Sequence, residues 1–204
     1  MGSESDDPQP DPIATPETTK IPEGIITVPA SGPPMFTDPD LGYAFAYPTG
    51  WVLQRTGNET EGVVMSMISS DGSVVVDIYK IFPPPRVPDV DQETHLRGYA
   101  EAILDMAKLD SPEFEVVARD VVELNDGTLA FAARYAIRGE SLLAGDILVV
   151  IRSEDEAALP FGDEAFVVRA TGPAIPYLAN NGNIQIVMEG FTLISRASGE
   201  PPSP

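Results

Sequence analysis

The chain has 204 residues, 43% of them hydrophobic, which suits a single domain with a sizeable core. Its 12 basic and 32 acidic residues give a net charge of −20, and such a surface repels nucleic-acid phosphates and anionic lipid headgroups. The absence of cysteine excludes disulfide bonds, thiolate zinc sites and cysteine nucleophiles. We therefore expect no nucleic-acid partner.

The two ends of the chain differ in composition from the middle. Residues 1–40 contain nine of the 21 prolines and eight acids, with Lys20 as the one base. Proline removes backbone donors and the acids repel one another, so we predict a disordered tether over residues 1–35. The apolar patch GIITV at 24–28 could add an edge strand. We predict one domain over 36–196 and a disordered tail over 197–204.

The first half of the predicted domain is rich in strand patterns. YAFAY at 43–47 alternates aromatic residues with alanines and is followed by a proline turn and Trp51, the only tryptophan. Residues 62–70 and 73–82 are β-branched runs joined by Asp71-Gly72, which predicts a hairpin. The prolines that follow position 82 end the second strand, because proline has no ladder donor.

The pattern then changes to a helical period over residues 89–109. We predict that Asp89 and Gln92 form a capping box at the start of this helix. One face is expected to be apolar, formed by Leu96, Tyr99, Ile103, Met106 and Ala107.

Strand patterns return after this helix. Residues 114–124 and 128–139 flank Asn125-Asp126-Gly127, which predicts a second hairpin. Residues 141–153 and 164–172 read as two further strands.

The last apolar pattern, at 183–195, has a helical period. Its apolar positions are Ile184, Val187, Met188, Phe191 and Ile194. Hairpin-connected strands with inserted helices predict an α+β fold, an antiparallel sheet of about seven strands with helices on its faces.

The segment DPDLGYAFAYPTGWVLQ resembles the opening motif of the PsbP-like family, in which a Gly-aromatic-x-Phe strand leads into Tyr-Pro-x-Gly-Trp. The matching residues are Gly42, Phe45, Tyr47, Pro48, Gly50 and Trp51. FVVRATGP and the later GFTLIS are similar to the family's closing pattern, with Gly190-Phe191 where the family has Ser-Phe. The resemblance spans roughly residues 36–196.

This resemblance implies an α/β/α sandwich in which Trp51 packs between sheet and helix. It also implies a non-catalytic role, since known members are extrinsic photosystem subunits, bacterial lipoproteins of largely unassigned function and a nuclear-import factor. Bacterial members are typically exported and tethered by an acylated N-terminal cysteine followed by a linker like ESDDPQPDPIATPET. We therefore expect an extracytoplasmic protein whose lipid anchor is absent from this sequence; the alternative is a cytoplasmic protein with a Pro-rich tail.

The residues offer little support for catalysis. His95 is the only histidine, and its place near the start of the predicted helix indicates a solvated surface side chain. Nucleophile-elbow, P-loop, zinc-protease and dinucleotide motifs are missing from the sequence. The acidic stretches at 38–40 and 153–164 lack the ligand density of a calcium loop. We predict no catalytic residue, no cofactor and no metal ligand.

Asp77 interrupts an apolar strand, on the same strand face as Val75 and Tyr79. If a helix covers this face, the carboxylate needs a partner, which Arg134 or Arg138 could provide. If the face is exposed to water, no partner is required.

Two loops are candidates for a partner-binding surface. Arg86 lies among prolines in PPPRVPDV at 83–90, a stiff segment that a strand-to-helix connection also explains. AIPYLANNGN at 174–183 reads as a loop that exposes Tyr177 and Leu178.

The main hypothesis is a monomeric, non-catalytic accessory or binding protein, exported and lipid-tethered, that docks a partner protein or ligand. The alternative is a carboxylate- or divalent-cation-dependent hydrolase of the cell envelope. Two neighbouring carboxylates in a cleft, one with a raised pKa, would favour the hydrolase.

Overall fold

The computed structural model describes residues 24–29, 31–56, 62–84, 86–87, 89–152 and 163–194. Residues 1–23 of the expected tether, most of the acidic stretch 153–164 and the expected tail 197–204 lie outside the described residues.

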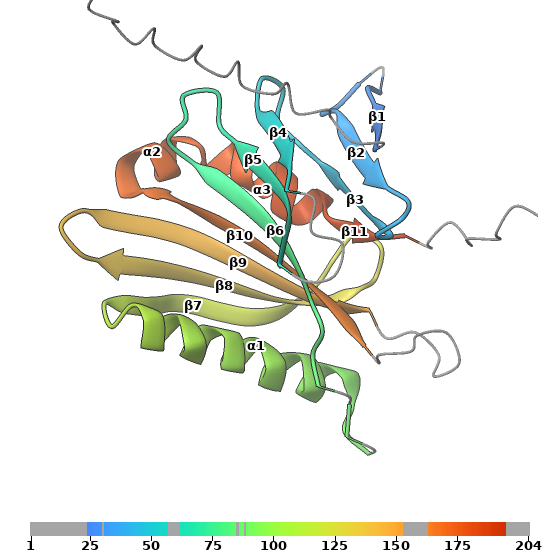
Figure 1. Ribbon diagram of the computed structural model, residues 1–204, viewed down its shortest axis with the longest axis vertical. Coiled ribbons are helices and arrows are strands. Elements are labelled where there is room, and N and C mark those ends of the chain that lie inside the picture. The colour runs from blue at the N-terminus through green and yellow to red at the C-terminus, as the bar shows by residue number, and fades with distance from the viewer. Residues whose placement is uncertain are drawn as a thin grey trace, which may run out of the picture.

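The described part of the chain is built on a seven-stranded antiparallel sheet (Figure 1). In spatial order its strands are β4 (Val52–Arg55), β5 (Gly62–Ile68), β6 (Val75–Ile81), β10 (Glu164–Pro173), β9 (Leu142–Arg152), β8 (Leu129–Arg138) and β7 (Phe114–Glu123). Each neighbouring pair is antiparallel. The predicted α+β class and seven-stranded antiparallel sheet are confirmed.

The two predicted hairpin turns join β5 to β6 and β7 to β8. Gly72 and Gly127 adopt φ values of 71° and 84°, which favour glycine because a Cβ atom is strained there. In the first turn the Asp71 carboxylate accepts hydrogen bonds from the Ser69 and Ser73 hydroxyls. These hydrogen bonds lower the pKa of Asp71 to about 2, and the bond from Ser69 has the larger effect.

A second, four-stranded sheet has the order β1 (Ile25–Thr27), β2 (Met35–Asp38), β3 (Tyr43–Ala46) and β11 (Thr192–Leu193). Its pairs are also antiparallel. β1 comes from the GIITV patch, so an edge strand lies within the range assigned to the tether. β11 brings the C-terminal end of the domain against the aromatic strand β3.

Helix α1 (Gln92–Asp110) begins later than the sequence pattern indicated. Its N-cap is Asp91, whose carboxylate accepts hydrogen bonds from the Thr94 amide and hydroxyl at 2.8 and 2.7 Å. The predicted capping box is wrong, because Asp89 has a φ of 69° and stands outside the helix.

The buried face of α1 is also rotated relative to the prediction. Leu96, Ala100 and Leu104 are the fully buried residues. Tyr99, Ile103 and Ala107 are half-buried beside them, whereas Met106 is 65% exposed. The placement of Met106 on the buried face is therefore wrong: its side chain lies at the margin of the helix–sheet contact.

The C-terminal region contains two helices, α2 (Ala174–Ala179) and α3 (Asn181–Gly190). The prediction of a loop over 174–183 is therefore wrong. The prediction of a helix to 195 is correct only as far as Gly190, beyond which the chain turns into β11. Gly190 lies so close to Ala46 that a Cβ atom would be 2.7 Å from the alanine Cβ, which explains why a small residue precedes Phe191.

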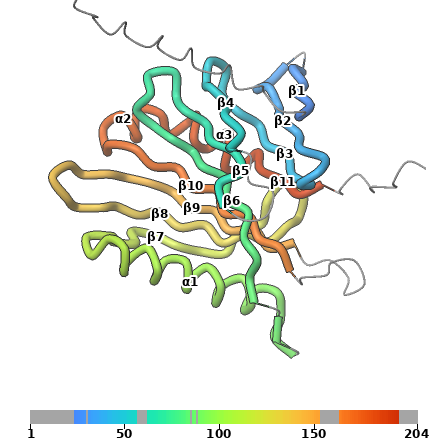
Figure 2. Tube along the Cα trace, in the orientation of Figure 1, coloured from blue at the N-terminus to red at the C-terminus, as the bar shows by residue number. Residues whose placement is uncertain are grey.

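The two faces of the seven-stranded sheet are covered differently (Figure 1, Figure 2). On one face lie the four-stranded sheet and α3, and we call this the closed face. On the other face lies α1, which contacts β7, β8 and β9. α1 therefore covers only part of its face of the sheet.

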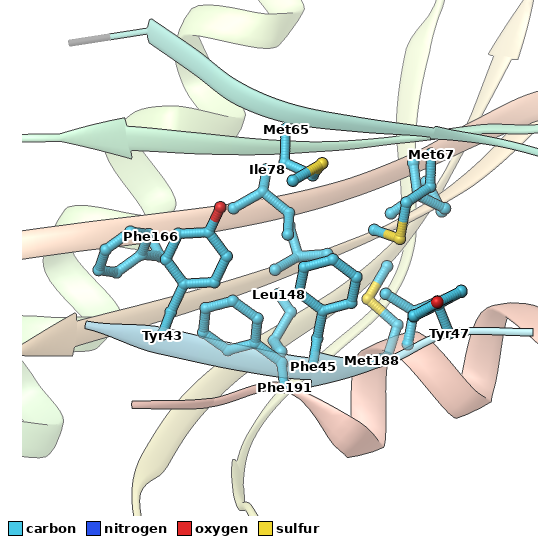
Figure 3. Packing of buried hydrophobic residues seen from close by; sticks show 14 of the residues in the cluster. Tyr43, Phe45, Tyr47, Met65, Met67, Ile78, Leu148, Phe166, Met188 and Phe191 are labelled. Atoms are coloured by element: carbon cyan, nitrogen blue, oxygen red, sulfur yellow. The ribbon is translucent and has the colours of Figure 1, made fainter. Parts of the chain in front are cut away.

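The closed face is filled by aromatic and methionine side chains (Figure 3). The centre of the Tyr43 ring lies 6.1 Å from that of Phe45, 5.3 Å from that of Phe166 and 6.0 Å from that of Phe191. Trp51 is 6% exposed and belongs to the same cluster. The predicted burial of the single indole is confirmed.

One end of the closed face holds a cluster of buried charges. Glu164, 1% exposed, lies with its carboxylate 3.0 Å from the Lys80 ammonium and 3.6 Å from the Arg152 guanidinium. Arg152 also donates to the carbonyl oxygens of Leu41 and Gly42, and so joins β9 to the turn before β3. Because buried charges are stable only when paired, these three side chains fix this end of the two sheets.

Candidate functional site

The residues proposed as a partner-binding surface lie in two separate places. Arg86 is exposed in the connection between β6 and α1. Tyr177 and Leu178 are in α2, which Figure 1 shows at the other end of the molecule. Leu178 is 68% exposed, but Tyr177 is 2% exposed. The expected exposure of Tyr177 is wrong, and the structure does not bring Arg86 together with α2.

Tyr177 can be buried because its hydroxyl has a hydrogen-bond acceptor, the Asp146 carboxylate. The hydroxyl donates to the Asp146 carboxylate at 2.7 Å, and the other carboxylate oxygen accepts from the Arg134 Nε at 2.9 Å. Burial, and then the bond to Asp146, raise the pKa of Tyr177. Arg134 and Asp146, which are already paired with each other, border an open cleft of about 460 Å³ beside α3.

His95 is not the solvated side chain that its sequence position indicated. Its side chain is 11% exposed, and its Nε2 lies 3.4 Å from the carboxylate of Asp163, immediately before β10. The contact places the first turn of α1 against the start of β10, a tertiary pairing that the local sequence does not reveal.

Asp77 is paired with Arg169 and Ser66, and not with Arg134 or Arg138 as the sequence suggested for a covered face. Its carboxylate accepts a hydrogen bond from the Ser66 hydroxyl at 2.6 Å and lies 3.9 Å from the Arg169 guanidinium. Arg134 and Arg138 bind Asp146 and Glu115 instead. Arg169 is the cross-strand partner because the antiparallel register places it directly opposite Asp77.

The part of its face that α1 leaves uncovered contains a cavity, which we call the α1 groove. It has a volume of about 530 Å³ and lies between α1 and the strands β6, β8, β9 and β10. Its floor is formed by Tyr79, Ile81, Tyr135, Ile137, Ile147 and Val167. Its wall is formed by Tyr99, Ala102, Ile103, Met106 and Ala107 of α1.

The floor of the α1 groove is shaped by Tyr135. Its ring stacks on Phe114 with centroids 4.8 Å apart, and its hydroxyl bonds to Thr171 and to the carbonyl oxygen of Ala170. The ring crosses β9 at Gly145, where any Cβ atom would overlap it. A glycine in the middle of a strand here permits one aromatic ring to span three strands.

The α1 groove has one polar end. His95 places the start of α1 near the start of β10, and Tyr135 connects Phe114, just beyond α1, with Thr171 near the end of β10. Asp110 and Ser111 at the end of α1 therefore lie toward the same end as Arg169 and Thr171. The rest of the lining is apolar or aromatic, a combination typical of small-molecule sites.

The described residues offer no grouping of three His, Asp or Glu side chains that could bind a metal ion. Within the same residues, no helix is both long enough and apolar enough to cross a membrane.

Sequence reasoning missed the α1 groove although it identified nearly every element around it. Two local signals were present: Gly145 interrupts an apolar strand, and Met106 sits on a helix flank beside Ala102. Neither signal is specific, because the cavity arises from the position of α1 over β7 to β9 rather than over the centre of the sheet.

Two solved structures share this architecture. Cyanobacterial PsbP (CyanoP) from Synechocystis sp. PCC 6803 superposes with a TM-score of 0.56 at 13% identity, covering 78% of this chain and 91% of that one. LpqN, involved in cell envelope biogenesis of Mycobacterium tuberculosis, superposes with a TM-score of 0.53 at 11% identity, covering 84% and 91%. No family model and no curated protein matches the sequence. The chain has the PsbP-like fold, as its opening and closing motifs predicted.

Proposed function

We propose that this chain is a non-catalytic accessory protein of the cell envelope, exported and lipid-tethered, which binds an apolar ligand in the α1 groove. The observation that carries this proposal is the groove itself, a cavity of about 530 Å³ lined mainly by apolar and aromatic side chains. A concave apolar site with a few polar groups at one end suits the burial of a small molecule. LpqN, one of the similar structures, is involved in cell envelope biogenesis.

The groove lining supports binding over hydrolysis. A carboxylate-dependent hydrolase needs two acids that share a site, and Asp110 is the single carboxylate among the residues that line the α1 groove. Hydrogen bonds lower the pKa values of Asp71 and Asp91, the opposite of the shift that a general acid requires.

The binding role is tested with N-phenyl-1-naphthylamine, a neutral apolar dye that fluoresces when removed from water. We expect saturable binding of one dye per chain. Ala102→Trp should abolish it, because an indole at this position of the wall fills the groove. Ala179→Trp, the same change at an exposed position of α2, should leave it intact. Dye binding that survives Ala102→Trp, or no binding by the unaltered protein, would contradict the proposal.

Export and anchoring are tested separately, on the native protein in its own cells. Metabolic labelling with palmitate, followed by fractionation, should place a labelled protein in the membrane fraction. An unlabelled protein in the cytoplasm would leave the groove proposal standing but refute the tether.

A further inference from the structure

The polar end of the α1 groove contains Arg169, whose guanidinium N–H groups donate no hydrogen bond to the residues that the structure describes. Arg169 has a side chain that is 47% exposed, and its guanidinium carbon lies 5.3 Å from the centre of the Tyr79 ring. Asp77 is its nearest carboxylate, at 3.9 Å, beyond hydrogen-bonding distance. The other oxygen of the Asp77 carboxylate accepts a hydrogen bond from the Ser66 hydroxyl.

Arg134 provides a direct contrast on the opposite face of the same sheet. Its side chain is 49% exposed, nearly the same as that of Arg169, yet its Nε donates to Asp146 at 2.9 Å. Arg169 has no hydrogen-bond acceptor for its guanidinium among the residues that the structure describes. Tyr79 therefore positions this side chain at the rim of the groove without occupying its N–H groups.

A guanidinium with free N–H groups binds carboxylate and phosphate oxygens in pairs, through charge-assisted hydrogen bonds. The apolar remainder of the groove, from Val167 toward Ile81 and Tyr99, provides a surface for an alkyl chain. We propose that the α1 groove binds a single-chain amphiphile with an anionic headgroup, the headgroup on Arg169 and the chain along α1. This inference rests on the proposed function, since it names the class of ligand in the same groove.

The charge of the protein indicates where such a ligand comes from. A net charge of −20 repels a bilayer rich in anionic lipids, whose surface potential acts on the whole molecule. A single anion that reaches Arg169 is affected chiefly by the guanidinium that it contacts and by the Asp77 carboxylate 3.9 Å from it, because charges farther than about 8 Å are screened at physiological salt. The ligand is therefore a free amphiphile and not a headgroup in a membrane surface.

The headgroup preference is measured by displacement of N-phenyl-1-naphthylamine with dodecanoate, dodecyl phosphate and 1-dodecanol, each below its aggregation limit. We expect both anions to bind about fivefold more tightly than the alcohol, because the half-exposed guanidinium gives a weaker bond than a buried one. Decanoate should bind about tenfold more weakly than dodecanoate, since two methylene groups are lost from the apolar contact.

Two variants locate the preference. Arg169→Gln should bind dodecanoate and dodecanol equally, while Arg97→Gln, an arginine of α1 with a similarly exposed side chain (44%), should keep the preference. Equal binding of anion and alcohol by the unaltered protein, or a preference that survives Arg169→Gln, would overturn the inference while dye binding still supports the groove. Binding to phosphatidylglycerol vesicles as tight as binding to dodecyl phosphate would overturn the free-ligand source. Failure of the dye itself to bind refutes the proposed function instead.

Discussion

The two faces of the seven-stranded sheet differ in how completely they are covered. The closed face is covered by a second sheet, a helix and a cluster of aromatic rings, with an ion cluster at one end and an open cleft of about 460 Å³ beside α3. The face under α1 is covered by one helix over β7 to β9, and a cavity of about 530 Å³ remains toward β6 and β10. The closed face therefore supplies stability, while the α1 face retains room for a ligand.

The largest effect is expected from a cavity in the closed face. Phe191 is 1% exposed among the rings of Tyr43 and Phe166. Phe191→Ala should lower the free energy of unfolding by about 3–5 kcal/mol, because the surrounding rings cannot collapse into the space. Ile103→Ala on α1, where the side chain is already half-exposed at the groove, should lower it by only about 1 kcal/mol. Urea unfolding followed by Trp51 fluorescence measures both, and equal losses would remove the distinction between the faces.

The ion cluster at the end of the closed face is expected to have the next largest effect. Glu164→Gln leaves the Lys80 and Arg152 charges without their buried carboxylate and should cost about 3 kcal/mol. Glu115→Gln removes an ion pair with Arg138 whose two side chains are more than half exposed, and should change stability by less than about 0.5 kcal/mol. Comparable urea midpoints for the two variants would show that the buried cluster is dispensable.

A smaller effect is expected at the floor of the α1 groove. Gly145→Ala forces the Tyr135 ring off β9 and should cost about 1–3 kcal/mol by overpacking. Gly98→Ala on α1 meets open space and should stabilise the protein by about 0.5–1 kcal/mol, because alanine is the better helix former. Thermal unfolding followed by circular dichroism measures the pair. An unchanged Tm for Gly145→Ala would contradict the role given to this glycine.

The smallest effect distinguishes two buried phenols. The Tyr43 hydroxyl on the closed face is buried without a hydrogen-bond partner among the described residues, whereas the Tyr135 hydroxyl binds the Ala170 carbonyl. Tyr43→Phe should therefore leave stability unchanged or raise it by up to about 1 kcal/mol, and Tyr135→Phe should lower it by about 1 kcal/mol. Urea unfolding at pH 7 checks the pair, and a loss of stability in Tyr43→Phe would indicate that this hydroxyl is satisfied.

The pH dependence of the same pair sharpens the test. Burial raises the pKa of both phenols above the ordinary value of about 10. The native state therefore retains its phenol protons at a pH where the unfolded chain loses them. The resulting stabilisation is complete below about pH 10 and declines as the pH rises above it. Unfolding measured between pH 9 and 11 should show a shallower decline for Tyr43→Phe than for the unaltered protein, and an identical slope would contradict the assignment.

Local patterns were sufficient to predict the hairpins, the main helix and the burial of Trp51. The turns at Gly72 and Gly127 need a backbone conformation that Asp-Gly provides. The indole of Trp51 follows an aromatic strand directly, and so large an apolar side chain at that position is buried in the core. The predicted start of α1 was wrong because Asp89 and Asp91 both precede the helix. Only the Asp91 side chain accepts a hydrogen bond from the Thr94 amide and so caps the helix.

The environment of the candidate site could not be predicted from local patterns. Tyr177 is buried with its hydroxyl donating a hydrogen bond to Asp146, 31 residues away, and Asp77 meets Arg169 through a strand register set by long-range pairing. The α1 groove depends on where a helix rests on a sheet, which is decided by contacts such as that between His95 and Asp163. Whether Arg86 and Leu178 contact a partner stays a prediction.

The pairing of β1 with β2 places the first described strand at one edge of the four-stranded sheet. Figure 1 shows β1 and α1 on opposite sides of the seven-stranded sheet. If the proposed anchor precedes β1, the seven-stranded sheet would lie between the attached end of the domain and α1. In that arrangement the proposed ligand of the α1 groove would be exchanged on the side of the sheet that faces away from β1.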